Sequence, residues 1–172
     1  MRCQNVTEPA LAVYGLVLEA FNGKAAVVER LSRGDAMIRI AFKKGYKYQL
    51  EDAFSLQTSV LPPKHIDTHF IRLTAEGNLT LARSYAWDGA TGVPDIPSMI
   101  RASLVHDALY QLMRHDLLDL GAYRKQADQL MRQLCVEDGM NPLLANAAYV
   151  SVRLLGEHHA RRESRKPLLF AP

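Results

Sequence analysis

The sequence of 172 residues is poor in cysteine, and it lacks any long hydrophobic run. Cys3 and Cys135 form neither a paired zinc-binding spacing nor a disulfide framework, so a reducing compartment fits. The longest uncharged apolar run, residues 10–18, is about half of what a bilayer crossing needs, and we therefore predict no transmembrane segment. Glu8 and Pro9 interrupt the approach to this run, so we expect no signal peptide.

The sequence also lacks a strong excess of charge of either sign. Twenty-one Lys and Arg stand against 18 Asp and Glu, and the net charge of +3 is too small to indicate a nucleic-acid partner. With 48% hydrophobic and 23% charged residues, the composition is that of an ordinary globular protein. It excludes wholesale disorder, collagen-like repeats and coiled coils. The length indicates one domain with a small appendage.

The first 35 residues are predicted to form an N-terminal helical extension. Thr7 can cap a helix, and Gly23 and Gly34 end two apolar-rich segments. The alternation at residues 16–18 leaves a strand open as the alternative there. We therefore place this extension outside the main domain.

Short alternating segments dominate the next part of the chain, residues 36–85. Four of them carry β-branched or aromatic residues and are predicted strands: residues 37–40, 46–50, 69–73 and 79–81. Residues 76–78, Glu-Gly-Asn, are a hairpin signal between the last two, and Pro62 and Pro63 mark a loop. We expect a small antiparallel β-sheet.

Helical patterns follow the predicted sheet. Three helices are expected, over residues 97–114, 123–138 and 141–155. Pro97 opens the first, Gly139 ends the second, and Asn141 with Pro142 caps the third. The predicted fold class is therefore α+β, a small antiparallel β-sheet followed by a helical hairpin and a third helix, within a single α+β domain over residues 36–157.

A basic C-terminal tail, residues 158–172, follows this domain. Its basic residues include Arg161, Arg162, Arg165 and Lys166. A solvated or disordered end is the commoner interpretation of such a tail, and contact with an anionic surface is the rarer one.

A loop rich in Gly and Pro, residues 85–98, runs into the first predicted helix, whose second turn carries His106 and Asp107. Glycine lets backbone carbonyls turn inward, and a carboxylate just inside the helix can meet them around a hard cation such as calcium. Asp88 and Asp95 are turn residues by default, although either is also a candidate metal ligand.

His106 points about 100° away from Asp107 around the helix, where it can act as a general base on a water. Tyr110 lies four residues later on the same face, so that its hydroxyl can join a hydrogen-bond network. A base histidine needs an orienting partner on its far nitrogen. Asp128, in the second predicted helix, can face His106 if the two helices pack antiparallel across a short loop.

This order of residues resembles the helix signature of calcium-dependent phospholipase A2, Arg-Cys-Cys-x-x-His-Asp-x-Cys-Tyr. Residues 101–110 read Arg-Ala-Ser-Leu-Val-His-Asp-Ala-Leu-Tyr, and residues 88–94 stand where that family keeps its calcium loop. The resemblance implies a similar helical core. It also implies that His106 activates the attacking water, that Asp107 binds calcium and that Asp128 supports the histidine.

The same resemblance places further calcium ligands on the loop, where carbonyls near Asp88, Gly89 and Ala90 would complete the metal site. The chain departs from the family in two respects. The loop lacks the full run of glycines, and three residues replace disulfide cysteines, namely Ala102, Ser103 and Leu109.

A second resemblance covers residues 37–156. The segments Tyr-Ala-Trp-Asp-Gly-Ala-Thr-Gly, Ser-Leu-Val-His-Asp-Ala-Leu-Tyr and the later Arg-Lys-Gln-Ala-Asp are similar to those of an uncharacterised family encoded by tailed phages and prophages. This resemblance is the more specific of the two. It implies a phage or prophage origin, hence the host cytoplasm or the virion as location, and it brings no established reaction.

Structural interpretations stand beside the catalytic ones. His106 and Asp107 can form a packing pair, with Asp107 bridging to Arg101 or Arg114. Asp128 by itself is typical of a helix-surface carboxylate paired with Arg124 or Arg132 at one-turn spacing. Trp87 is expected in the core, and a lipid-facing position is the alternative.

Two functional hypotheses follow. The first is a phage-type phospholipase A2-like hydrolase, in which water activated by His106 attacks a phospholipid ester with calcium assistance; its partner would be a phospholipid or membrane surface. The alternative is a non-enzymatic phage virion or assembly protein, partnered by other phage structural proteins, in which the His-Asp-x-x-Tyr motif is structural. A Walker loop, a Gly-x-Ser-x-Gly elbow and a His-Glu-x-x-His motif are absent from the sequence.

Overall fold

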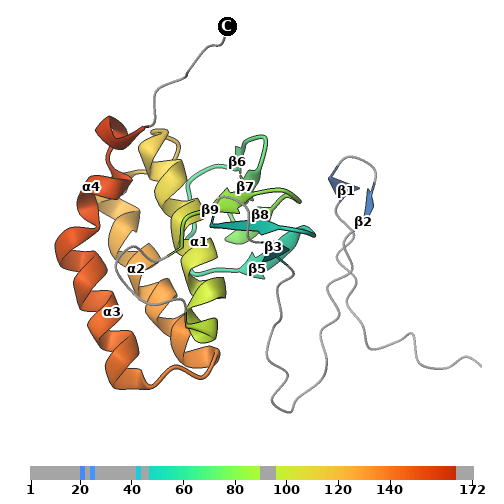
Figure 1. The fold of residues 1–172 in the computed structure, drawn as a ribbon. Coiled ribbons are helices and arrows are strands. Elements are labelled where there is room, and N and C mark those ends of the chain that lie inside the picture. Colours follow the sequence, from blue (N-terminus) through green and yellow to red (C-terminus); the bar gives the residue numbers. More distant parts are fainter. Residues whose placement is uncertain (1–19, 22–23, 26–41, 44–46, 90–95, 166–172) are drawn as a thin grey trace, which may run out of the picture. The chain divides into compact units, whose positions relative to one another are not determined.

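The structure, a computed structural model, describes residues 20–21, 24–25, 42–43, 47–89 and 96–165 (Figure 1). The chain forms two compact units, Met1–Ala36 and Met37–Pro172. In its described residues the second unit combines antiparallel strands with helices, and the predicted α+β class is confirmed.

The first unit differs from the predicted helical extension in the four residues that can be compared. β1 (Ala20–Phe21) and β2 (Lys24–Ala25) pair antiparallel, with Phe21 opposite Lys24. The sequence between them is Asn-Gly, the dipeptide most strongly associated with two-residue hairpin loops. The helical interpretation overlooked this signal. The rest of the predicted extension lies outside the described residues.

A four-stranded antiparallel sheet in the second unit has the order β5-β8-β7-β6. Its strands are β5 (Phe54–Gln57), β6 (Ile66–Asp67), β7 (Ile71–Leu73) and β8 (Asn78–Leu81). Ile71 lies opposite Leu81 and Leu73 opposite Leu79, and all four side chains are fully buried. Since side chains alternate across a strand, these pairs give the sheet one apolar face.

The turn between β7 and β8 depends on Gly77. Its φ is +87°, and a Cβ there would lie 2.6 Å from the carbonyl oxygen of Thr58. Only glycine adopts this conformation at this distance without strain. The predicted hairpin signal therefore lies where the structure has its turn.

A three-stranded sheet has the order β3-β4-β9, from β3 (Phe42–Lys43), β4 (Tyr48–Leu50) and β9 (Ala86–Trp87). Tyr48 lies opposite Trp87, and their rings stack with centroids 5.1 Å apart. Trp87 is buried, as expected, and its indole N–H donates to the Ser103 hydroxyl of the first helix at 3.2 Å. This contact ties the sheet to the helices.

The predicted strands at 46–50, 69–73 and 79–81 correspond to β4, β7 and β8. The predicted strand at 37–40 lies outside the described residues. β3, β5, β6 and β9 were not predicted. β3, β6 and β9 have two residues each, which is too few to show an alternation.

Three helices follow the sheets: α1 (Pro97–Arg114), α2 (Leu120–Glu137) and α3 (Pro142–Leu155). Asn141 caps α3 as predicted, accepting the backbone N–H of Leu143 at 2.8 Å. The second helix begins earlier than predicted, because Asp119 caps it through the N–H of Ala122. Gly139, with a φ of +88°, follows its C-terminus.

In Figure 1 the sheets of the second unit lie on one side of α1, and α2 and α3 lie on the other. α1 is therefore covered on most sides, and 12 of its 18 residues are buried. Among the described helices, none is long and apolar enough to cross a bilayer.

The start of the predicted basic tail is folded. α4 (Glu157–Ala160) and the 3₁₀ helix η1 (Arg162–Ser164) both contact α1. Ala160 is fully buried, and Arg165 pairs with Asp116 at 2.9 Å. Residues 158–165 are therefore folded rather than disordered, because Arg165 and the buried Ala160 fix this segment to the helices, whereas most of its side chains, including Arg161 and Arg162, are exposed as predicted. Residues 166–172 lie outside the described residues.

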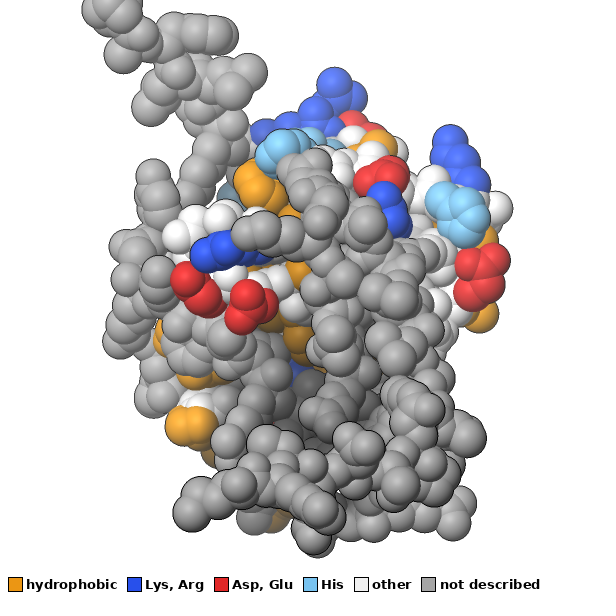
Figure 2. All heavy atoms as spheres, turned by 90° about the vertical axis from the view of Figure 1, so that its right-hand side faces the viewer, with side chains coloured by type: hydrophobic (Ala, Val, Ile, Leu, Met, Phe, Trp, Pro, Cys, Tyr) orange, Lys and Arg blue, Asp and Glu red, His pale blue; other side chains and the backbone are white. Residues whose placement is uncertain are grey.

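Charged side chains of both signs are interspersed on the face drawn in Figure 2. Among the side chains coloured there, Lys and Arg lie close to Asp and Glu near its upper edge. This distribution agrees with the small net charge of the sequence.

Candidate functional site

His106 and Asp128 meet at the centre of the α1–α2 hairpin. The two helices run antiparallel, and His106 Nε2 lies 2.7 Å from Asp128 Oδ1. An ionised carboxylate only accepts hydrogen bonds, so Nε2 carries the proton and donates it. The structure thus brings together the two residues that the sequence predicted to face each other.

Tyr110 joins the same carboxylate. Its hydroxyl donates to Asp128 Oδ1 at 2.7 Å, and its ring lies against the His106 ring with centroids 4.0 Å apart. Burial, together with the adjacent Asp128 carboxylate, raises the pKa of Tyr110 far above its usual value. The hydroxyl therefore remains protonated and acts as a donor.

Asp128 is fully buried, so the interpretation as a surface carboxylate is wrong. Its other oxygen, Oδ2, accepts a hydrogen bond from Arg153 of α3 at 2.8 Å. Burial by itself would raise the pKa of Asp128, but the hydrogen bonds donated to the carboxylate outweigh burial and hold the pKa below its usual value. Asp128 is therefore a buried, ionised anchor for three side chains.

Arg124 extends this cluster to the end of α3. Its Nε donates to the Tyr110 hydroxyl at 3.2 Å, and its Nη2 donates to the carbonyls of Val152 and Arg153 at 2.9 and 2.8 Å. The Val152 carbonyl also accepts the backbone N–H of Gly156, so Arg124 is a second donor there, and it supplies a donor to the Arg153 carbonyl in the last turn of α3. Arg124 thus does not pair with Asp128 along one helix, as its spacing suggested, but connects α1 and α2 with α3.

The roles of Arg124 and Arg153 were not predicted from the sequence. Both residues contact their partners across helices, and Arg153 lies 25 residues from Asp128 in the chain. The available signal was the buried stripe of the second helix, which contains Asp128 and implies that this charge needs a partner from elsewhere.

The second ring nitrogen of His106, Nδ1, has no hydrogen-bond partner among the residues that the structure describes. With the proton on Nε2, the neutral ring carries a lone pair on Nδ1. The side chain is 9% exposed, and it is therefore enclosed on most sides. In its neutral form His106 therefore has the unpaired ring nitrogen that a general base requires.

Asp107 has a different environment from Asp128. The backbone N–H of Gly89 donates to its carboxylate, and Asp88 adds a second negative charge nearby. Burial is the main cause that raises the pKa of Asp107 to about 6, and the charge of Asp88 raises it further, against the opposing effect of His106 and Arg114. Asp107 is therefore the carboxylate of this region whose charge is least well compensated.

The alternative bridge from Asp107 to Arg101 is not formed. Arg101 is buried and pairs instead with the end of α2, at 2.8 Å from Asp138 and 3.1 Å from Glu137. This ion pair fixes the start of α1 against the end of α2, and it leaves Asp107 facing the loop.

Gly89 fixes the start of the loop that leads to α1. Its φ is +73°, and a Cβ there would lie 2.9 Å from the ring of Tyr48. The residue therefore has to be glycine for the backbone N–H to reach Asp107 while the ring of Tyr48 packs behind it. Ala90, the next predicted ligand, lies outside the described residues.

The possible oxygen ligands at Asp107 fit a calcium ion in part. Asp107 and the exposed Asp88 offer the hard oxygen ligands that calcium prefers, and a cation would relieve their mutual repulsion. Gly89, however, presents its N–H rather than its carbonyl to Asp107. In the part of the chain that is described, no group of three His, Cys, Asp or Glu residues converges as a metal site. The remaining ligands of a calcium ion would have to be backbone carbonyls or water.

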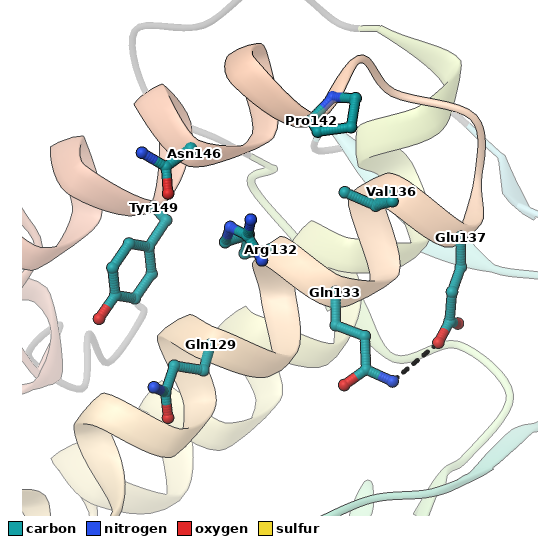
Figure 3. Close-up of a pocket in the computed structure, with 8 residues that line it drawn as sticks. All are labelled: Gln129, Arg132, Gln133, Val136, Glu137, Pro142, Asn146 and Tyr149. Carbon is teal, nitrogen blue, oxygen red and sulfur yellow. Dashed lines mark hydrogen bonds between the residues drawn. The ribbon is translucent and has the colours of Figure 1, made fainter.

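Two of the surface grooves formed by described residues are lined by neither His106 nor Asp107. One lies between α2 and α3 (Figure 3), and the other lies where α1, α2 and α4 meet.

No family model, curated protein or solved structure matches this chain. The site itself therefore carries the functional argument.

Proposed function

We propose that the protein is an ester hydrolase of the phospholipase A2 type, with His106 as general base. The observation that carries the proposal is the asymmetry of the imidazole. Nε2 donates to the buried Asp128 carboxylate, whereas Nδ1 has no partner among the described residues. The resemblance of residues 101–110 to the phospholipase A2 signature supplies the substrate class, a glycerophospholipid ester.

In this reaction Nδ1 of His106 takes a proton from a water, and the resulting hydroxide attacks the ester carbonyl. Asp128 stabilises the imidazolium that forms, because its ionised carboxylate accepts the Nε2–H. When the tetrahedral intermediate collapses, the imidazolium returns the proton to the departing alcohol. Tyr110 keeps Asp128 in place and takes no proton itself, since its pKa is far above neutrality.

Calcium would be held by Asp107 and Asp88, and it would supply positive charge beside the ester oxygen. The raised pKa of Asp107 supports this assignment, because it indicates a carboxylate whose negative charge is not balanced by the protein.

The test is phospholipid hydrolysis by the full chain, in mixed micelles with and without calcium. His106→Gln retains an amide donor toward Asp128 but has no base, so a loss of at least about 100-fold in rate is expected. His115→Gln is the matched control, because His115 also precedes an aspartate but lies on the surface. Hydrolysis by His106→Gln at the parent rate would exclude the mechanism.

A second candidate function is a non-enzymatic phage virion or assembly protein. Its supporting observation is burial: His106 is 7% exposed, and the Asp128 carboxylate is occupied by donors from α1 and α3. On this hypothesis the cluster only holds three helices together. Thermal melting with and without millimolar calcium separates the two, since an ion bound to the native state raises the melting temperature. No shift, together with no hydrolysis by the parent, favours the structural role.

A further inference from the structure

The outer face of α3 is apolar except for Ser151. At 100° per residue, seven positions fall within about 140° of the helix circumference. We call them the α3 stripe: Leu143, Leu144, Ala147, Val150, Ser151, Leu154 and Leu155. Leu143, Leu154 and Leu155 are 83%, 76% and 77% exposed. Large aliphatic side chains in such a contiguous exposed patch mark a binding surface.

The α3 stripe contains no charged side chain. The helix has one charged residue, Arg153, which lies on the other side and pairs with Asp128. A helix that lies on a membrane carries Lys and Arg along the border of its apolar face, and α3 lacks this border. The stripe is therefore better suited to a protein partner than to a lipid surface.

The order of side-chain sizes along the stripe is symmetric about position 149. Two leucines stand at each end, and the small Ala147 and Ser151 stand between them at equal distances from the centre. When a second α3 is laid antiparallel on the first, Leu143 therefore meets Leu154 and Leu144 meets Leu155, because each pair lies on the same edge of the stripe. Ala147 meets Ser151, which lets the two backbones approach closely. A surface that matches its own copy in this way suits a twofold-symmetric dimer.

Polar side chains border the stripe on its α2 side. The groove between α2 and α3 is lined by Gln129, Arg132, Gln133, Val136, Glu137, Pro142, Asn146 and Tyr149 (Figure 3). Three of these side chains are uncharged amides, and two carry charges of opposite sign. Such polar side chains are typical of the rim of a protein interface. They offer a second copy hydrogen bonds around the apolar centre without repelling it.

From these observations we infer that the α3 stripe is the interface of an antiparallel homodimer, with its twofold axis beside position 149. The inference does not depend on the proposed hydrolase activity. A stripe of one helix is small compared with a standard interface, so the dimer forms at micromolar or higher concentration.

The first test is analytical ultracentrifugation of the full chain from micromolar to submillimolar concentration. The parent is expected to dimerise, and Leu154→Lys to raise the dissociation constant at least about tenfold, because two lysines would be buried across the axis. Leu61→Lys is the matched control, since Leu61 is 55% exposed but lies far from α3 in the chain. Far-ultraviolet circular dichroism establishes that both variants are folded.

The second test addresses the register. Ala147→Cys and Ser151→Cys are prepared separately, mixed and oxidised. The antiparallel pairing predicts a disulfide between the two variants in the mixture and little dimer from either variant alone. A monomeric parent, a dimer that Leu154→Lys leaves intact, or a stripe that binds anionic vesicles without dimerising would each overturn the inference, and so would equal cross-linking in all three samples.

Discussion

Two carboxylates near the middle of the helical hairpin have opposite environments. Asp128 is fully buried, yet its pKa is lowered, because His106, Tyr110 and Arg153 donate to it. Asp107 is partly exposed, yet burial of its carboxylate and the charge of Asp88 raise its pKa. Burial alone therefore does not decide the charge state of a carboxylate, and the number of donors around it does.

The two groups contribute to stability with opposite dependence on pH. Asp128 has a pKa below the usual aspartate value of 3.8, so its contribution is present above that pH and is lost as the pH falls through the lowered pKa. Asp107 has a pKa of about 6, so the folded state holds its proton between pH 3.8 and 6. Stability therefore falls as the pH rises through that window.

The largest effect is expected for Asp128→Ala. The substitution leaves an imidazole, a phenol and a guanidinium without their shared acceptor, and the free energy of unfolding should fall by about 3–5 kcal/mol. Urea denaturation at pH 7 measures it. Asp128→Asn retains an acceptor oxygen and should lose less. A loss below about 1 kcal/mol for the alanine variant would mean that the carboxylate does not organise the three helices.

A smaller effect is expected for Gly89→Ala, which tests the support of Asp107. The positive φ and the approach of the new Cβ to Tyr48 should together cost about 2–3 kcal/mol. Gly139→Ala is the matched control, because its φ is +88° and nothing lies within 4 Å of its Cβ. It should cost only the backbone strain, about 1 kcal/mol. Equal losses in the two variants would show that Tyr48 does not restrict the loop.

Asp107→Asn should stabilise the protein at pH 8 by about 1–2 kcal/mol, because it removes a carboxylate whose ionised form is disfavoured in the folded state. At pH 3 the Asp107 carboxyl is protonated in the folded protein and largely protonated in the unfolded chain, and the difference should nearly vanish. Denaturation at the two pH values measures this dependence. A variant that is less stable than the parent at pH 8 would contradict the raised pKa.

The smallest effect is expected for Asp88→Asn, which removes one negative charge near Asp107. Since burial is the larger cause of the raised pKa, the pKa of Asp107 should fall by only about half a unit. Carboxyl titration by nuclear magnetic resonance measures it. Asp52→Asn, on the surface before β5, is the control and should leave the pKa of Asp107 unchanged.

Local chemistry made the helices predictable. Pro97, Gly139 and the Asn141-Pro142 pair mark three of their ends, and the structure has helix boundaries at these residues. The opposition of His106 and Asp128 was also predicted, on the condition that the two helices pack antiparallel, which a short connection permits. The strands β5 and β9 were not predicted, because each is paired with a strand that is distant in the chain.

The sequence by itself determined where α1 and α3 begin, where α2 ends, and that α1 carries His106, Asp107 and Tyr110 close together. Those features depend on interactions within a few residues. The tertiary structure alone decided that Asp128 is a buried anchor held by Arg153, and that Asp107 is left to a single backbone donor. Burial and hydrogen bonding depend on which distant segments share the space around a side chain, and no local pattern records that.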